Sequence, residues 1–425
     1  MLRRFLFCVL LSIAAVAVVL GLPHQGMAKT LYRWVQLGPE GPSARAITDD
    51  DSCPALMVDG VALPMMDRAD PKQVLANVPP AQFAVRSCER VIPAGTVAVT
   101  LEGAALPIPR PNPSRILIIG DTGCRLKEGD PIQDCNSEEG WPFPHLAASA
   151  ASSRPDLVIH VGDYHYRETA CPADHSGCQG SPSGYGWDAW AADFFKPASP
   201  LFAVAPWIMT RGNHEDCARA GEGWWRFLDA EPLKEACIDL NGSFLARLGE
   251  FGVVVVDGAN APDPKRDPGA LVDRLARQFA GIGDRMPAEV WLATHRPLNA
   301  MRGEMGKLAV DNRVEQQALG PLMPEAVSMI VSGHIHFFQA LDFGAARPAQ
   351  LVAGVSGDNL EPMVPKPVAG EIINGATVVH ATTRSAFGYV VLDRAGPGAW
   401  LGVVFDDRGK PVEHCRLDGR SLTCG

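Results

Sequence analysis

A single aspartate, Asp163, stands where its carboxylate could bridge two metal ions. It follows the apolar stretch 157–161 and one glycine, and the polar stretch Tyr164–Tyr166 comes directly after it. A mainly apolar run of this kind predicts a strand buried on both faces of a parallel sheet, and the ligands of such sheets gather where the strands end. At that edge, each oxygen of Asp163 can reach a different ion. We therefore expect the rest of the chain to bring further oxygen and nitrogen ligands to this carboxylate.

Four other apolar runs also end in residues that bind metals. The residues at their ends are Asp121, Asn213, His295, and the closely spaced pair His334 and His336. A single aspartate after a strand is usually a helix cap or a turn residue, and a single histidine is usually a hydrogen-bonded polar group. Five such ends at equivalent positions are hard to explain as turns, so they predict one shared metal site.

An alternation of strands and helices, which begins near residue 115, would position these ends. Strands are predicted at 116–119, 157–161, 207–209, 290–293 and 328–331, a hairpin at 244–248 and 251–256, further strands at 351–355, 389–392 and 400–405, and helices at 145–153, 187–195, 268–279 and 314–322. Strands that alternate with helices are typical of an α/β fold. His334 and His336 are two residues apart, which suits an irregular turn that sends them to different metals.

Residues 29–112 have a different pattern, which predicts a small β-rich, sandwich-like domain. Short β-type patches at 31–37, 82–86 and 96–101 lie among prolines, glycines and aspartates, without a long amphipathic helix. The stiff segment 107–113 is a plausible connector. We therefore expect one domain over 29–112 and a second over 113–425, with no catalytic cluster in the first.

The five strand ends, taken in order, resemble the signature of calcineurin-like metallophosphoesterases. The blocks are Gly120-Asp121-Thr122-Gly123, Gly162-Asp163-Tyr164-His165-Tyr166, Gly212-Asn213-His214-Glu215, Thr294-His295 and Gly333-His334-Ile335-His336. They are most similar to the purple acid phosphatase branch, where the first block is Asp-x-Gly and the second ends in tyrosine. The resemblance covers about residues 115–405. It implies a metallophosphoesterase-type α/β sandwich of two mixed β-sheets flanked by helices, here preceded by the β-rich domain.

The resemblance also implies two sets of metal ligands. Metal one would take Asp121, Asp163, Tyr166 and His336, and metal two would take Asp163, Asn213, His295 and His334. Carboxylate and phenolate oxygens favour Fe(III), while imidazoles with an amide and a shared carboxylate suit Zn, Fe(II) or Mn. A tyrosine normally stays protonated at neutral pH, so the metal would have to displace its proton.

The activity implied by the resemblance is hydrolysis of phosphomonoesters, with Asp163 as the shared catalytic carboxylate. Two ions about 3.5–4 Å apart lower the pKa of a bridging water, clamp the phosphoryl oxygens and stabilise an in-line displacement. We expect the bridging hydroxide to attack phosphorus without a phosphoenzyme. The expected partner is a small phosphate ester.

The second catalytic residue implied by the family is His214, as a phosphate contact or a proton-transfer group. It could instead hold Asn213 in place, and Glu215 and Asp216 are expected to orient their neighbours. The acid for the leaving group is missing, because the segment 298–312 contains no histidine. Arg296 and Arg302 could bind phosphate oxygens but cannot deliver a proton. His165 could contact substrate or could be a solvated loop residue.

Two other functions remain open at this point. A phosphodiesterase or nucleotidase could use the same metal pair, because the loops that set specificity, 124–135, 171–186 and 216–240, cannot be interpreted from sequence. A fold retained only as a binding module would have lost ligands, and all seven positions are present. Trp187, Trp190, Trp224 and Trp225 could line the site, but their helical spacing favours the core.

The cysteines predict disulfides. Ten remain without Cys8, and near-neighbour pairing gives Cys53–Cys88, Cys124–Cys135, Cys171–Cys178, Cys217–Cys237 and Cys415–Cys424. The connectivity is not fixed by sequence, and scattered buried thiols are the alternative. Cys171, His175 and Cys178 are more simply a disulfide loop than a zinc site.

The first 28 residues predict an export signal. A basic start and an apolar stretch over 5–22 end in Gly26-Met27-Ala28, which suits cleavage after Ala28; an uncleaved anchor is the alternative. Removal of two arginines would take the formal charge from −10 to −12, which argues against nucleic-acid binding. No later stretch is apolar enough to span a membrane. We expect a periplasmic or extracellular protein, and the sequence does not indicate its oligomeric state.

Overall fold

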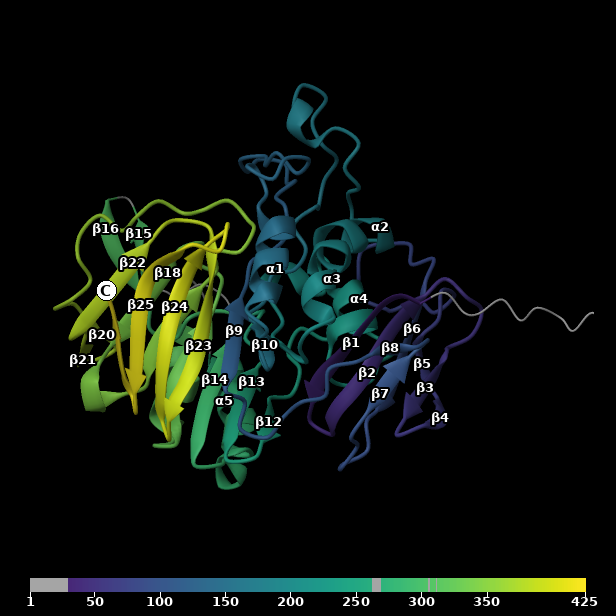
Figure 1. Cartoon of the computed structure of the whole chain (residues 1–425). Helices are drawn as coiled ribbons and strands as arrows, with labels where there is room; N and C mark the ends of the chain where they lie inside the picture. The colour runs from purple at the N-terminus through teal and green to yellow at the C-terminus, as the bar shows by residue number, and fades with distance from the viewer. Residues whose placement is uncertain (1–29, 262–268, 305, 311) are drawn as a thin grey trace, which may run out of the picture.

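The computed structural model describes residues 30–261, 269–304, 306–310 and 312–425, so the predicted signal peptide lies outside the described residues. Two mixed β-sheets form its centre (Figure 1). The larger has the order β26 (Ser421–Cys424), β25 (Pro411–Asp418), β24 (Ala399–Asp406), β23 (Gly388–Gly396), β9 (Arg115–Ile119), β10 (Leu157–His160), β11 (Trp207–Met209), β1 (Thr30–Gly38), β2 (Gly41–Thr48), β6 (Arg86–Val91) and β5 (Met66–Ala69). The smaller has the order β12 (Phe244–Leu248), β13 (Phe251–Val256), β14 (Glu289–Thr294), β17 (Val327–Ser332), β19 (Ala349–Ala353), β18 (Phe338–Asp342) and β22 (His380–Arg384).

The two sheets pack against each other through one apolar face of each. Ile118 and Ile159 of the larger sheet belong to the same buried cluster as Val253, Trp291 and Val331 of the smaller sheet. Strands β9, β10 and β11 run parallel to one another, as do β13, β14, β17 and β19. The carboxyl ends of these parallel strands therefore carry the loops in which the metal-binding residues were predicted.

Helices cover the outer face of each sheet. On the larger sheet these are α1 (Phe143–Ser152) and the continuous run of α2 (Trp187–Trp190), the π-helix η2 (Ala191–Phe195) and α3 (Lys196–Phe202). On the smaller sheet they are α5 (Gly269–Ala280) and α6 (Arg313–Leu319). The result is a helix–sheet–sheet–helix sandwich, which confirms the predicted fold class.

The N-terminal strands continue the larger sheet. Gln36 of β1 lies opposite Trp207 of β11 in parallel register, and β2, β6 and β5 follow outward. A second sheet of β4 (Val61–Pro64), β3 (Ala55–Val58), β7 (Val99–Leu101) and β8 (Ala104–Ala105) packs on this extension. The region is β-rich as predicted, although only the last residue of the patch at 82–86 is in a strand, where β6 begins. The domain boundary after residue 112 stays a prediction.

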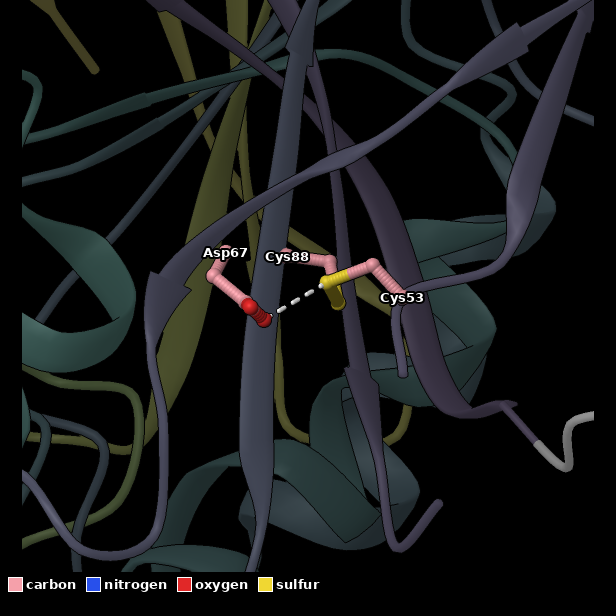
Figure 2. A group of neighbouring side chains, drawn as sticks. All are labelled: Cys53, Asp67 and Cys88. Carbon is pink, nitrogen blue, oxygen red and sulfur yellow. Dashed lines mark hydrogen bonds between the residues drawn. A yellow bond between two sulfur atoms is a disulfide. The ribbon is translucent and has the colours of Figure 1, made fainter. Parts of the chain in front are cut away.

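The ten cysteines form five disulfides. They are Cys53–Cys88, Cys124–Cys135, Cys171–Cys178, Cys217–Cys237 and Cys415–Cys424, the near-neighbour pairs expected above. Figure 2 shows the first, with Asp67 Oδ1 at 3.2 Å from Cys53 Sγ. Because both sulfurs are bonded to each other, neither is a thiolate ligand, and this group is not a metal site. In the described part of the chain, no helix combines the length and the apolar character needed to cross a bilayer.

Candidate metal centre

The loops after five strands converge between the two sheets. Asp121 follows β9, Asp163 follows β10 and Asn213 follows β11, so the larger sheet supplies three of the predicted ligands. The smaller sheet supplies the others: His295 directly after β14, and His334 with His336 after β17. Pairing of parallel strands sets these ends side by side, which is why residues far apart in the sequence meet.

Asp163 lies at the centre of the group. Its Oδ2 accepts a hydrogen bond from Tyr166 Oη at 2.8 Å and lies 3.2 Å from His295 Nε2. Asp163, His295 and His334 each offer one potential ligand atom, and these three atoms lie within 4.8 Å of one another. His295 Nε2 is also 3.0 Å from Asn213 Oδ1. These four residues form a compact set of one carboxylate, one amide and two imidazoles.

A second set meets on the other side of Asp163. Tyr166 Oη lies 3.1 Å from His336 Nε2 and 3.3 Å from Asp121 Oδ1, and His336 Nε2 is 3.3 Å from the same Asp121 oxygen. Asp121 is fully buried. The two sets share Asp163 and have the same members as the ligand sets implied by the resemblance. Carboxylate, phenol and imidazole groups gathered at these distances are the donors that suit transition-metal cations.

The backbone at these ends adopts a conformation that most residues avoid. Asp121, Asp163 and His334 have φ angles of 55°, 58° and 68°. Left-handed backbone at residues other than glycine costs free energy and clusters at functional sites. Neighbouring glycines make room for it: a Cβ on Gly212 would lie 2.1 Å from the Asp163 nitrogen, and one on Gly333 would lie 2.2 Å from Asp121 Oδ2. The glycine–ligand pattern in the sequence thus has a steric cause.

Glu215 ties the loops after β10 and β11 together. Its carboxylate is fully buried and accepts hydrogen bonds from four backbone N–H groups, those of Asp163, Tyr164, His165 and Gly212, at 2.9–3.1 Å. A carboxylate that accepts several backbone bonds fixes the conformation of both loops. This geometry agrees with the orienting role expected for Glu215.

Asp193 does the same for the loops after β9 and β10. It is a buried residue of η2, and its oxygens accept the backbone N–H groups of Cys124, Tyr166 and Arg167 as well as Arg167 Nε. Sequence reasoning missed it, because a single acid within an aromatic-rich helix carries no pattern that marks a function.

Arg125 and Asp358 form a second buried support that sequence reasoning missed. Arg125 Nε donates to Asp358 Oδ1 at 3.0 Å, Nη2 pairs with the other oxygen, and Nη1 donates to Asp130 at 2.8 Å. Asp358 Oδ2 is 3.4 Å from His336 Nδ1, and the guanidinium carbon of Arg125 lies 4.9 Å from the centre of the Tyr166 ring. Carboxylates beside a metal-binding histidine fix its tautomer and orientation.

His214 faces the open side of the group. Its Nε2 is 3.9 Å from Asp163 Oδ2, its Nδ1 is 2.5 Å from Arg219 Nη2 and 3.1 Å from Glu168 Oε1, and its ring lies 3.8 Å from that of Tyr166. Burial lowers the pKa of His214 to about 3, although Asp163 acts in the opposite direction. The ring is therefore neutral at pH 7. Its Nδ1 lies between a guanidinium donor, Arg219, and a carboxylate acceptor, Glu168, while its Nε2 faces Asp163.

These residues border a cleft of about 460 Å³. Its lining includes Arg125, Asp163, Tyr166, Asn213, His214, Arg302, His334 and His336. Arg302 pairs with Glu361 at the mouth, with an N–O distance of 3.1 Å. The cleft is open enough for a small ester to approach the two sets of donors.

Two residues predicted to contact substrate are not part of the cleft lining. Arg296 is outside the cleft lining, with its Nη1 at 2.9 Å from His334 Nε2. His165 is fully buried, 5.8 Å from the ring of Tyr185 and 5.5 Å from that of Trp190. The structure does not bring His165 to the cleft, because its side chain points into the aromatic core.

Other side chains considered for a function have structural roles. Trp190, Trp224 and Trp225 are buried in the core beneath the helices, and Trp187 packs partly buried against the same cluster. His175 bonds Asp134 at 2.6 Å while its flanking cysteines form a disulfide, an arrangement unlike a zinc site.

The family follows from the match of the sequence to known families. The model of the family described as calcineurin-like phosphoesterase matches residues 114–338, which include all seven of the convergent residues. The chain belongs to the calcineurin-like phosphoesterase family. Proteins of this family are metal-dependent hydrolases of phosphate esters and bind a dinuclear metal centre. The donor set described above fits such a centre.

Solved structures share the fold at low sequence identity. The purple acid phosphatase PPD1 from seeds of yellow lupin (Lupinus luteus) is 13% identical, with a TM-score of 0.60 over 93% of this chain and 74% of that one. A structure of PhoD is 10% identical, with a TM-score of 0.53 over 94% of this chain and 92% of that one. A comparison with curated protein sequences finds no match. The similarity extends over the N-terminal β-rich part as well as the family region.

Proposed function

We propose that this phosphoesterase hydrolyses phosphomonoesters in the manner of purple acid phosphatases. The observation that carries the proposal is the position of Asp163 Oδ2, which lies 2.8 Å from Tyr166 Oη and 3.2 Å from His295 Nε2. One carboxylate oxygen thus contacts a donor from each of the two sets. A phenol in that position is the feature that distinguishes the purple acid phosphatase pattern from the wider family.

The two sets of donors would each hold one ion. Asp121, Asp163, Tyr166 and His336 would hold Fe(III), and Asp163, Asn213, His295 and His334 would hold Zn, Fe(II) or Mn. Arg296 donates to His334 Nε2 and so helps to orient this ring. When bound, the ions supply Lewis-acid stabilisation of the phosphoryl oxygens and a water of lowered pKa.

The chain's own residues bind and orient the substrate. His214, neutral and with its Nε2 facing Asp163, would contact a phosphoryl oxygen at this position. Arg219 and Glu168 keep its ring in that orientation. Arg302 at the mouth of the cleft would attract the anionic ester, and its ion pair with Glu361 would limit the motion of the Arg302 side chain. The preorganised loops let these groups act without reorganisation when substrate arrives.

We also propose that the protein is exported. Five disulfides close short segments of the chain, and disulfides persist in oxidising compartments. Together with the predicted signal peptide, they support a periplasmic or extracellular location. Expression with the native N-terminus, followed by fractionation and sequencing of the mature end, tests this; mature protein in the cytosol with residues 1–28 intact would contradict it.

Metal analysis combined with two chromogenic esters tests the activity. The purified protein should contain close to two metal ions and hydrolyse p-nitrophenyl phosphate faster than its bis ester. Asp163→Asn keeps the size of the side chain and should reduce hydrolysis at least about hundredfold, because it removes the shared ligand charge. Asp418→Asn, at an exposed position outside the cleft lining, is the matched control. Faster cleavage of the bis ester would replace the proposal with a phosphodiesterase, and full activity of Asp163→Asn would reject the site.

A further inference from the structure

A second cavity lies on the outer side of the smaller sheet, away from the metal centre. Its volume is about 550 Å³, and none of its lining residues borders the catalytic cleft. It is bounded by α6, by the hairpin of β20 (Ile372–Ile373) and β21 (Ala376–Thr377), and by the turn between β25 and β26. Figure 1 shows this hairpin at the end of the molecule opposite the N-terminal strands. Nothing in the proposed reaction uses this cavity.

The charge of the cavity is unlike that of the rest of the protein. Two arginines, Arg347 and Arg420, line it, and none of the lining residues is acidic. Within the described residues, neither Arg347 nor Arg420 forms an ion pair with a carboxylate. The whole chain carries a formal charge of −10. An acid-free cavity with two unpaired guanidinium charges therefore favours an anion.

Both guanidinium groups are held in place by neutral partners. Arg347 Nη1 donates to Asn299 Oδ1 at 2.9 Å and Nη2 to the Asn374 carbonyl at 2.8 Å. Arg420 Nε donates to the Val327 carbonyl at 3.0 Å and Nη2 to the Pro324 carbonyl at 2.6 Å. These bonds orient the groups without neutralising them, and each guanidinium keeps N–H groups that no described residue accepts.

Burial without a carboxylate partner makes the charged form of Arg347 less favourable than in water. Burial lowers the pKa of Arg347 from its ordinary value, with no carboxylate acting in the opposite direction. A half-buried cation gains more from an added anion than a solvated one, because less water screens the pair. If the arginines only capped backbone carbonyls, a neutral donor would serve as well, so their charge points to a ligand.

The rest of the lining indicates what carries the anionic group. Leu298, Met323 and Ile330 form an apolar wall, while the side-chain amides of Asn299 and Gln317 offer hydrogen bonds. Small-molecule sites combine an apolar lining with a few placed polar groups in this way. A bare inorganic ion would leave the apolar wall unused.

We propose that Arg347 and Arg420 form a binding site for a small organic anion, a carboxylate or phosphate carried on an apolar group. The arginines take the charged oxygens and the apolar wall takes the remainder. The site does not depend on the metal centre, so the proposal stands or falls independently of the catalytic assignment.

Isothermal titration of the metal-loaded protein with phenylphosphonate and with benzoate tests the site. Gln317 lies exposed on α6 at the edge of the cavity, so Gln317→Glu adds a negative charge without removing any arginine bond. It should weaken binding of at least one probe about tenfold, as expected for a like charge at this range. Gln317→Ala, the neutral control, should bind as the wild type does. Arg420→Met should abolish the same binding event and Arg420→Lys should restore part of it.

The active site is a competing location for both probes, and hydrolysis separates the two. The three variants expected to have lowered affinity, Gln317→Glu, Arg420→Met and Arg420→Lys, should all retain the wild-type KM for p-nitrophenyl phosphate. The proposal is overturned if neither probe binds saturably, or if the only binding event is unchanged in Gln317→Glu and Arg420→Met. Preference for phenylphosphonate over benzoate would assign a phosphate group, and the reverse a carboxylate.

Discussion

The hydroxyl of Tyr166 lies 2.8 Å from Asp163 Oδ2, and His295 approaches the same oxygen to 3.2 Å from the opposite sheet. The two sheets share no strand pairing, so this oxygen joins their loops through side chains, in addition to backbone bonds such as that from the Asp358 N–H to the Asp121 carbonyl. Buried carboxylates need compensating charge or hydrogen bonds. A cation on each side of Asp163 would supply that charge, which connects the packing of the sandwich to its chemistry.

The first prediction concerns the phenol. In the iron-loaded wild type, a phenolate on Fe(III) should give a visible charge-transfer band. Tyr166→Phe removes only the hydroxyl, which lies between Asp121, Asp163 and His336, so the band should disappear while the fold persists. Absorption spectra of both proteins at equal iron content provide the measurement. An unchanged band in the variant would remove Tyr166 from the ligand set.

A second prediction concerns the glycine before Asn213. In Gly212→Ala the new methyl group would meet the backbone nitrogen and Oδ1 of Asp163, each at 2.1 Å. The loops after β10 and β11 would have to separate, so we expect a loss of about 1–3 kcal/mol in unfolding free energy, together with lower metal content. Gly396→Ala, where a methyl group meets nothing within 4 Å, is the control. Equal urea midpoints for the two variants would show that the loops do not require this contact.

Much of this site could be predicted from sequence because each ligand follows an apolar run and a turn residue. The same pattern also marks Asp358, which follows β19 through Ser356 and Gly357. The family resemblance has no block at that point, so it does not mark Asp358 as a functional residue. The pairing of β1 with β11 could not be predicted, since a single register between distant segments leaves no local signal. The position of His165 was equally hidden, because a polar residue after a strand gives no sign that it turns inward.

The third prediction tests the support behind His336. Arg125→Met would leave the fully buried carboxylate of Asp358 without its cation, and breaking a buried pair in this way costs about 3–5 kcal/mol. The double variant Arg125→Met/Asp358→Asn removes both charges and should recover most of that loss. Urea unfolding of the two single variants and the double variant completes the cycle. Additive losses would mean that the two residues do not act as a pair.

The double variant also has a spectroscopic consequence. The guanidinium of Arg125 lies over the Tyr166 ring, and a cation there stabilises the ring's electrons. Its removal should shift the iron band to longer wavelength in both variants that lack Arg125, whatever their stability. Asp358→Asn alone keeps the cation and controls for the change near His336.

The last prediction concerns pH. Glu315 is fully buried on α6, and Thr294 Oγ1 donates to its Oε2 at 2.8 Å. Burial raises the pKa of Glu315 to about 7, whereas the same group titrates near its ordinary value in the unfolded chain. At a pH between the pKa of the unfolded chain and that of the folded protein, the folded state therefore holds one more proton at Glu315. The stabilisation from this proton is complete below the pKa of the unfolded chain. As the pH rises through 7 that contribution is lost, by up to about 3 kcal/mol.

Glu315→Gln has no proton to lose and keeps the size of the side chain. Its unfolding free energy relative to the wild type should therefore increase from pH 5 to about pH 7 and level off by pH 8, as the wild-type glutamate is forced to ionise in a buried environment. Urea unfolding at four pH values gives the difference directly, with both proteins at the same ionic strength. Gln317→Glu on the exposed face of the same helix should show no such trend, because its carboxylate stays in water in both states. A constant difference for Glu315→Gln across this range would mean that Glu315 is already ionised in the folded protein, held by Thr294 and the neighbouring cations instead of by a proton.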